Sequence, residues 1–188
     1  DTGAMYRVAT FVALQKETDD AKEIIEFIEK NPISFMNGQK GQEVLMSSEN
    51  VTEVIRTNEV TNTVSKISAM TEIREFMVAE QQRIAKNGGI IMDGRDIGTV
   101  VLPKADLKIF LVASVDERAE RRYKENLSKG IPTNLERLKI EISERDRKDS
   151  TRAISPLKQA EDAILLDSTG KTINEIVQFI EDKAKELM

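Results

Sequence analysis

The sequence predicts an α/β fold in which helices flank a parallel sheet. Three short apolar segments, at residues 90–92, 107–113 and 163–167, have the length and the residue types of buried strands. Each is followed by a stretch with helical periodicity, and strands that alternate with helices build parallel sheets that are covered on both faces. Ligands of such sheets bind beyond the carboxyl ends of the strands, so the polar residues after each segment are candidates for a functional site.

The chain before the first of these segments is mostly helical, with one interruption. Apolar spacing predicts helices over residues 4–16, 20–30 and 58–87, the last in two pieces. The glycine pair at 88–89 ends the last helix, because a left-handed cap costs glycine little. Residues 33–55 differ, since glycines separate short apolar runs there, which favours a small hairpin or meander inserted between helices.

Two later helices carry sequence signals at their first turns. Ser114 with Glu117, and Thr172 with Glu175, fit a capping box, in which a hydroxyl and a carboxylate reciprocally accept bonds from backbone donors. The helix predicted over 172–188 is amphipathic, which is typical of ordinary packing through one apolar face.

Composition restricts the chemistry that is open to this chain. Its 188 residues suit one domain, with room for a smaller lobe. The absence of cysteine and histidine excludes disulfides, thiol catalysis and a Ser-His-Asp triad. A net charge of −5 disfavours nucleic acid as a partner. No apolar stretch approaches the ~20 residues of a membrane span, so we expect a cytoplasmic protein with no membrane partner.

The strongest local signal for a site is the run Asp93-Gly94-Arg95-Asp96, directly after the segment 90–92. Two acids and an arginine at the carboxyl edge of a sheet are hard to explain by packing. A guanidinium donates two parallel hydrogen bonds and keeps its charge, so arginine is well suited to gripping a phosphate. The run therefore predicts a phosphate ester as ligand.

A second group of charges, Arg145, Asp149 and Arg152, has the spacing i, i+4 and i+7, so one face of a helix presents all three. The pattern fits a clamp in which the arginines bind phosphate and the aspartate binds a sugar hydroxyl. It also fits a solvated helix with ordinary ion pairs. Arg118 and Arg122 share a face of another helix, where interleaved glutamates favour the surface interpretation.

Three further features bear on a phosphate ligand. The arginine-rich region 116–152 carries Gly130 to Pro132 at its centre, which fits a hinged helical lid that closes over a polyphosphate. Tyr6 and Arg7 lie near a helix start, where backbone N–H groups favour anions, although Tyr6 fits the edge of a core equally well. Arg74 lies on an amphipathic helix, where solvent exposure is the plainer interpretation.

Taken together, these residues resemble the bacterial cytidylate kinases, and the resemblance runs along the whole chain. The segments that carry it are residues 1–7, 92–101, 117–122, 145–149 with Arg152, 156–157 and 166–170. The insert at 33–55 resembles the small sheet that marks this family among nucleoside monophosphate kinases. The resemblance implies a P-loop nucleoside monophosphate kinase fold as one domain over 1–188, with a CMP-binding insert over 20–87 and a lid over 116–152.

The resemblance also implies an activity and a role for each matching residue. The expected reaction transfers the γ-phosphate of ATP to CMP or dCMP, with Mg²⁺ accompanying ATP, no metal ligand from the motifs present, and a monomeric chain. Arg95, Arg145 and Arg152 are the expected catalytic residues. The remaining expected contacts are Thr2, Tyr6 and Arg7 in the CMP pocket, Ser65 and Arg74 at the cytosine and acceptor phosphate, Arg95 and Asp96 at the phosphate and base, Arg145 and Asp149 at the ribose, and Arg118 and Arg122 at ATP.

One feature departs from the family pattern. No Gly-x-x-x-x-Gly-Lys-Ser/Thr loop occurs, although such a loop precedes the Asp-Thr-Gly motif in the family, so we expect the first strand and the P-loop to be absent from this chain. Two alternatives therefore stay open. One is a fragment that binds CMP without transfer, and the other is a related UMP or AMP kinase, against which the insert and the run at 93–98 argue.

Overall fold

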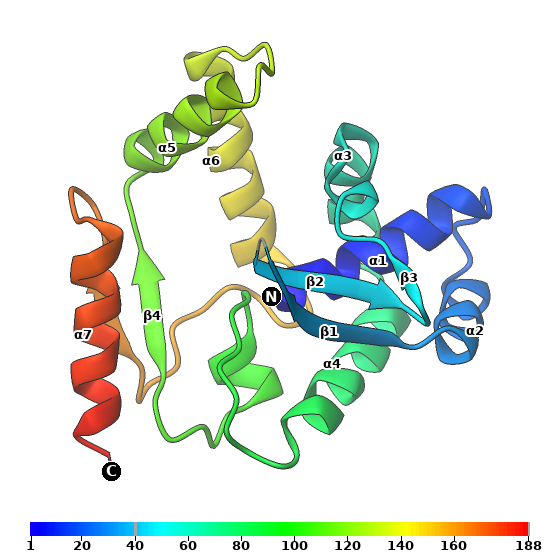
Figure 1. Cartoon of the computed structure of the whole chain (residues 1–188), viewed down its shortest axis with the longest axis horizontal. Helices are drawn as coiled ribbons and strands as arrows, with labels where there is room; N and C mark the ends of the chain where they lie inside the picture. Colours follow the sequence, from blue (N-terminus) through cyan, green and yellow to red (C-terminus); the bar gives the residue numbers. More distant parts are fainter. Residues whose placement is uncertain (40, 188) are drawn as a thin grey trace. The chain divides into compact units, whose positions relative to one another are not determined.

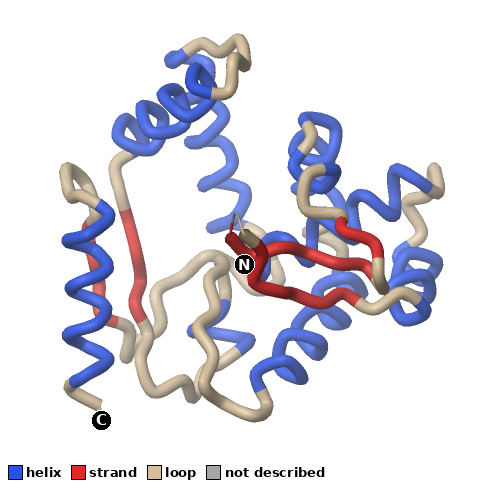
Figure 2. Tube along the Cα trace, in the orientation of Figure 1, coloured by secondary structure: helices blue, strands red, loops and turns tan. Residues whose placement is uncertain are grey.

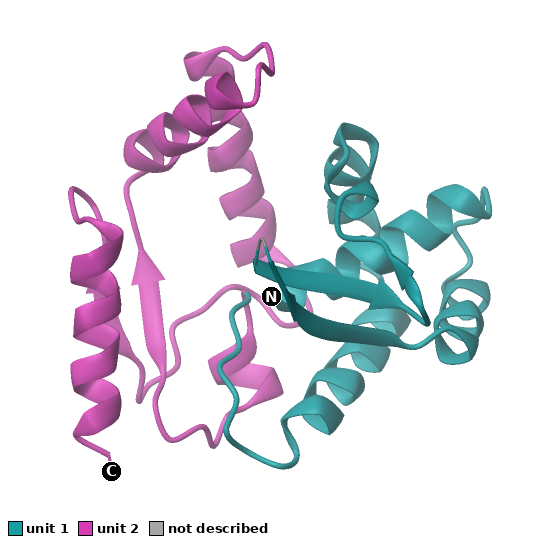
Figure 3. Cartoon of the chain, in the orientation of Figure 1, with its two compact units in different colours: residues 1–94 teal, residues 95–188 magenta. Residues whose placement is uncertain are grey.

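The computed structural model describes residues 1–39 and 41–187. The chain forms two compact units, residues 1–94 and residues 95–188, which are coloured separately in Figure 3. We refer to them as the amino-terminal unit and the carboxyl-terminal unit. The predicted insert at 20–87 falls within the first unit, and the predicted lid at 116–152 falls within the second.

The amino-terminal unit is built on four helices and a short 3₁₀ turn. These elements are α1 (Thr2–Gln15), α2 (Ala21–Lys30), the turn Val54–Arg56, α3 (Asn58–Ile67) and α4 (Thr71–Ala85) (Figure 1). The carboxylate of Asp1 caps the first helix, since it accepts a hydrogen bond from the backbone N–H of Ala4 at 3.2 Å. The helices predicted in this part of the chain are confirmed, including the division of residues 58–87 into two.

A three-stranded antiparallel meander lies between α2 and the 3₁₀ turn. Its strands are β1 (Ile33–Gly38), β2 (Gly41–Met46) and β3 (Glu49–Asn50), in that spatial order (Figure 2). Phe35 stands opposite Val44 in the register, and Val44 is fully buried. The predicted small sheet within residues 33–55 is therefore confirmed.

An apolar core joins the helices of this unit to the meander. Its members come from all four helices, the 3₁₀ turn, β1 and β2, and they include Val8, Val12, Ile24, Ile67, Ile73, Met77 and Val44. The apolar core residues of α4 are spaced four apart and come from one face of that helix, whereas buried residues extend around most of α1. The core fixes α1 and α4, the two helices that carry Thr2, Tyr6, Arg7 and Arg74.

The carboxyl-terminal unit contains a parallel strand pair and three long helices. Its elements are a short π-helix (Ile97–Val101), β4 (Ile109–Val112), α5 (Val115–Ser128), α6 (Leu135–Thr151), β5 (Ile164–Asp167) and α7 (Ile173–Lys185) (Figure 1). The strand register pairs Ile109 with Ile164 and Val112 with Asp167 in parallel. The parallel arrangement predicted for these two segments is confirmed.

The segment 90–92 does not form the strand that the sequence predicts. The residues of this segment have no regular secondary structure, and Ile91 is 94% exposed. An apolar run becomes a strand only when a neighbouring strand supplies its backbone partners, and no described segment pairs with these residues. The run was thus correctly recognised as apolar, but the prediction of a strand was wrong.

The predicted capping boxes have different outcomes. Thr172 and Glu175 form the complete box at the start of α7. At α5 the hydroxyl of Ser114 accepts from the Glu117 N–H at 3.1 Å, but the Ser114 N–H donates to Thr169 Oγ1 at 3.0 Å. Glu117 instead accepts a bond from Arg121, so the second half of that box was wrongly predicted.

The last helix does not bury the apolar face that its sequence offers. No residue of α7 is buried, and Ile173 and Val177 are exposed. The prediction of ordinary packing is therefore not confirmed for this helix. No helix within residues 1–39 and 41–187 is both long and apolar enough to cross a membrane.

Candidate active site

The amino end of α1 is tied to the residues that follow α4. Thr2 is buried, and its hydroxyl donates a hydrogen bond to the backbone carbonyl of Asp93 at 2.7 Å. The Thr2 N–H donates to the same oxygen at 3.1 Å. These two bonds hold the first residue of α1, the helix that carries all three predicted CMP-pocket residues, against residue 93.

Tyr6 and Arg74 form the most buried polar contact among the predicted acceptor residues. The side chains come from α1 and α4, and Arg74 is only 2% exposed. Its guanidinium carbon lies 5.1 Å from the centroid of the Tyr6 ring, and Nη1 donates to the carbonyl of Ser68 at 3.0 Å. A cation on an aromatic face is favoured most where water is excluded, so these contacts hold the guanidinium in one orientation.

Arg7 links α1 to the segment that begins α3. Its Nη1 donates to the carbonyl of Ile55 at 3.1 Å and to Thr61 Oγ1 at 2.9 Å. Ser65 lies one turn beyond Thr61 on α3 and is exposed. Thr61 and Ser65 therefore share a helix face, and Arg7 reaches that face at its Thr61 end.

In the carboxyl-terminal unit three arginines surround one carboxylate. Arg95 donates from Nε to Asp149 Oδ2 at 3.1 Å. Arg152 Nη1 lies 3.6 Å from Asp149 Oδ1, and Arg145 Nε lies 3.9 Å from Oδ2. Asp149 is 17% exposed in its side chain, whereas Arg95 and Arg145 are each 44% exposed. We call these four residues the Asp149 cluster.

The Asp149 cluster carries more positive than negative charge. Three guanidinium groups face one carboxylate, and the pKa of Arg145 is lowered by desolvation and then by the nearby charges of Arg95 and Arg122. A lowered pKa means that the surroundings disfavour a further cation. An anion is the group that such a cluster would accept most readily, and the partly exposed guanidinium groups can donate to its oxygens.

Arg152 joins this cluster in a way that the helical spacing did not predict. The helix α6 ends at Thr151, and Arg152 is its C-cap residue with extended backbone angles. Its Nε donates to the carbonyl of Ser155 at 2.6 Å, which holds the side chain beside Asp149. The three residues do meet, but the prediction that one helix face presents all of them was wrong for Arg152.

Asp96 lies at the start of the π-helix and is 4% exposed. Its backbone carbonyl accepts from the N–H groups of Val100 at 2.9 Å and Val101 at 3.3 Å. These two bonds fix the backbone of Asp96 at the start of the π-helix.

The two lid arginines have different environments. Arg118 donates through Nη1 and Nη2 to the carboxylate of Asp146 at 2.9 and 2.5 Å, and through Nε to the carbonyl of Ala113 at 3.1 Å. The bonds to Asp146 raise the pKa of Arg118. Arg122, one turn further along α5, is partly exposed and forms no hydrogen bond or ion pair with the described residues.

Comparison with known proteins gives the family. The family model described as cytidylate kinase matches residues 1–186. This chain belongs to the cytidylate kinase family. The cytidylate kinase of Lactococcus lactis subsp. lactis (strain IL1403) is 99% identical over 188 residues, which are 100% of this chain and 86% of that protein. That of L. lactis subsp. cremoris (strain MG1363) is 84% identical with the same coverage, and that of Streptococcus sanguinis (strain SK36) is 59% identical over 191 residues, covering 100% and 85%.

Two polar residues of this chain were not assigned a role from sequence. Asp146 accepts two hydrogen bonds from the guanidinium of Arg118, and Arg121 donates to the carbonyl of Ser168 at 2.7 Å. Asp146 lies 28 residues from Arg118, and no periodicity relates two residues at that separation. Only the i, i+4 pair of Glu117 with Arg121 carried a readable signal, and that pair forms at 2.8 Å.

Neither unit presents a ready metal cage. Among residues 1–39 and 41–187, no group of three acids lies close enough to hold a metal ion.

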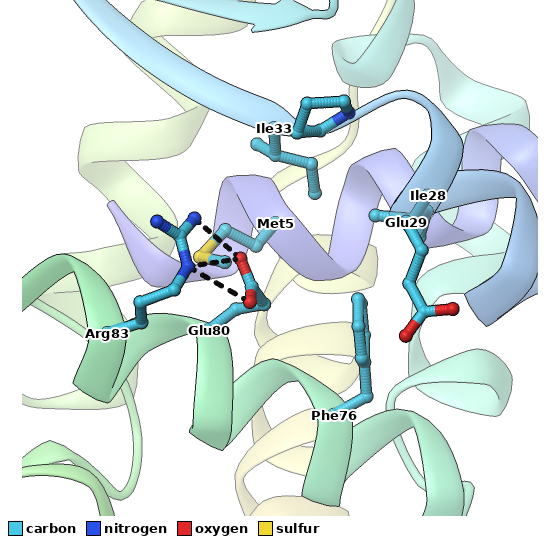
Figure 4. A pocket seen from close by; sticks show the side chains of 8 residues that line it. Met5, Ile28, Glu29, Ile33, Phe76, Glu80 and Arg83 are labelled. Carbon is cyan, nitrogen blue, oxygen red and sulfur yellow. Dashed lines mark hydrogen bonds and ion pairs between the residues drawn. The ribbon is translucent and has the colours of Figure 1, made fainter.

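The described pockets are lined by residues other than the predicted site residues. A pocket of about 280 Å³ in the amino-terminal unit has Met5, Ile33 and Phe76 on its apolar walls. The ion pair of Glu80 with Arg83 closes one side of it, as Figure 4 shows. A pocket of about 550 Å³ in the carboxyl-terminal unit lies between residues 98–108 and 155–162. None of the twelve predicted site residues lines either pocket.

Proposed function

We propose that this chain transfers the γ-phosphate of ATP to CMP or dCMP, which gives ADP and CDP or dCDP. The observation that carries the proposal is membership in the cytidylate kinase family, with the match extending over residues 1–186. The relatives at 99% and 84% identity are both cytidylate kinases and align with the whole of this chain.

The proposed chemistry needs no histidine. Phosphoryl transfer depends on alignment of the two nucleotides and on neutralisation of charge at the transferring phosphate, more than on covalent catalysis. The acceptor phosphate is already ionised near neutral pH, so no strong general base is required. We assign charge neutralisation to Arg95, Arg145 and Arg152, and the surplus positive charge of the Asp149 cluster supports that assignment.

We assign the acceptor nucleotide to the residues that the family resemblance names. In this proposal Thr2, Tyr6 and Arg7 line the CMP pocket, and Ser65 and Arg74 contact the cytosine and the acceptor phosphate. The buried and oriented guanidinium of Arg74 supports a phosphate role. Asp96 is assigned to the base, Asp149 with Arg145 to the ribose, and Arg122 to ATP.

Several finer points belong to the same proposal. ATP is expected to bring Mg²⁺ on its phosphates, where the ion would offset phosphate charge. The chain is expected to act as a monomer in the cytoplasm, without nucleic acid as a partner, in keeping with its net charge of −5.

The test is formation of ADP with ATP and Mg²⁺ in the presence of CMP, dCMP, UMP or AMP. We expect turnover with CMP and dCMP that exceeds turnover with UMP and AMP. Preference for UMP or AMP would assign the chain to a different acceptor. Binding of CMP by calorimetry with no ADP formed would contradict the proposed transfer and support a binding module in its place.

A further inference from the structure

The carboxyl-terminal half of α6 is held in an unusual way. Residues 143–151, Ser-Glu-Arg-Asp-Arg-Lys-Asp-Ser-Thr, contain no apolar side chain, and none of them is buried. The small apolar core between α5 and α6 ends at Ile142, together with Ala119 and Leu138. Because hydrophobic burial cannot fix this polar run, its position depends on polar contacts.

Asp146 provides such a contact within the run. Both of its carboxylate oxygens accept from the guanidinium of Arg118, at 2.9 and 2.5 Å. The two-bond fork fixes orientation as well as distance, which a single point contact does not do. Asp146 directly follows Arg145 and lies one helical turn before Asp149, so any displacement of Asp146 moves both residues of the cluster.

Arg118 is itself anchored to the strand pair. Its Nε donates to the carbonyl of Ala113, the first residue after β4, at 3.1 Å. One turn further on, Arg121 donates to the carbonyl of Ser168, the first residue after β5, at 2.7 Å. The start of α5 is thus fastened to the carboxyl ends of both strands, and Arg118 extends that attachment to α6.

We infer that Arg118 and Asp146 are a positioning pair, which holds the polar end of α6 so that Arg145 and Asp149 face the nucleotide in one fixed geometry. This inference rests on the proposed function, and it gives Arg118 a role other than the ATP contact implied by family resemblance. Arg122, which forms no such contacts with the described residues, stays the lid arginine assigned to ATP.

A positioning role for Arg118 and Asp146 predicts kinetics that differ from those expected if Arg118 contacts ATP directly. Asp146→Asn and Arg118→Ala should each lower kcat/KM for CMP by roughly 10- to 100-fold. The reason is that a misplacement of about 1 Å at a reacting group lowers the rate by up to about 100-fold. The double variant should be no worse than either single one, since both remove the same interaction. The exchanged pair Arg118→Asp with Asp146→Arg should recover part of the loss.

A second readout does not depend on turnover. Amide hydrogen exchange of residues 143–151 should become faster in Asp146→Asn without nucleotide. Glu144→Gln is the matched control, because it changes an exposed acid to an amide within the same run, and it should leave both exchange and kinetics unchanged.

The possible outcomes separate the two claims. Faster exchange in Asp146→Asn with no wild-type ADP formation would support the positioning pair and reject the proposed function. Unchanged exchange in Asp146→Asn would overturn the pair whatever the kinetics. A rise in KM for ATP alone in Arg118→Ala, with normal Asp146→Asn kinetics, would also overturn it. The positioning pair would also be overturned if the loss of activity in both variants were explained by a lower melting temperature.

Discussion

The two units of this chain are stabilised by different kinds of interaction. In the amino-terminal unit an apolar core joins four helices to two strands, and residues such as Ile73 and Met77 are fully buried. In the carboxyl-terminal unit the cluster between α5 and α6 has three buried residues, and α7 has none. In this second unit, hydrogen bonds from Arg118 to Asp146 and from Arg121 to Ser168 link elements that are joined by apolar contacts in the first unit.

The difference matters for how each unit can present charged side chains to a nucleotide. Arg74 projects from a helix that is fixed by the core, so its orientation is set before any ligand binds. The Asp149 cluster lies on a helix end that apolar packing does not fix. Substitutions should therefore affect mainly stability in the first unit and mainly activity in the second.

The largest effect on stability is expected from Met77→Ala. Removal of a fully buried side chain from the core should lower the free energy of unfolding by about 2–5 kcal/mol. Ile140→Ala on α6 is the matched change in the other unit, and it should cost less than about 1 kcal/mol because Ile140 is 65% exposed. Urea unfolding measures both, and equal costs would contradict the proposed difference between the units.

The next largest effect is expected on catalysis from Arg145→Ala. Loss of one preorganised charge contact should lower kcat about 10²- to 10³-fold. The melting temperature should change little, because the side chain is partly exposed and its carboxylate contact is as long as 3.9 Å. Arg147→Ala, an exposed arginine in the same polar run, should keep the wild-type rate. Equal rates in the two variants would remove Arg145 from the proposed site.

A smaller and more specific effect is expected from Asp149→Ala. Part of the loss should be common to both acceptors, because the three arginines lose the carboxylate between them. If Asp149 also binds the ribose 2′-hydroxyl, which dCMP lacks, the loss with CMP should exceed the loss with dCMP by about tenfold, as for one hydrogen bond to a charged group. Equal losses in kcat/KM for the two substrates would exclude that sugar contact.

The smallest effect concerns acid stability in the carboxyl-terminal unit. Bonds from Lys108 Nζ at 2.9 and 2.6 Å lower the pKa of Asp162 below its ordinary value of 3.8. A carboxyl group with a lower pKa in the folded state adds stability above its unfolded pKa and loses it as the pH falls through the folded pKa. The free energy of unfolding should thus fall more steeply below about pH 4 in the wild type than in Asp162→Asn. If the free energy of unfolding falls equally steeply with decreasing pH in the wild type and in Asp162→Asn, this contribution is refuted.

Much of the fold follows from the sequence because helices are local. The spacing of Ile24 and Ile28, the glycines after α4 and the Thr172 cap each act within a few residues, and the corresponding elements form. The segment 90–92 was mispredicted because a strand also needs a partner that its own residues do not specify.

The candidate site shows the same limit. Helical spacing brought Arg145 and Asp149 together in the prediction, since one turn separates them. The contact of Arg95 with Asp149 spans 54 residues, and that of Arg118 with Asp146 spans 28. Such pairs are set by tertiary structure, so family resemblance could name Arg118 as functional but could not distinguish a ligand contact from a positioning role.

Amide hydrogen exchange on the whole chain, with and without CMP and a non-hydrolysable ATP analogue, tests the central contrast most directly. We predict slow exchange in α1 and α4 in both states, and exchange in residues 143–151 that is faster than in α1 without nucleotide and slows further when the nucleotides bind. Exchange in residues 143–151 that is already as slow as in α1 without nucleotide would contradict the account.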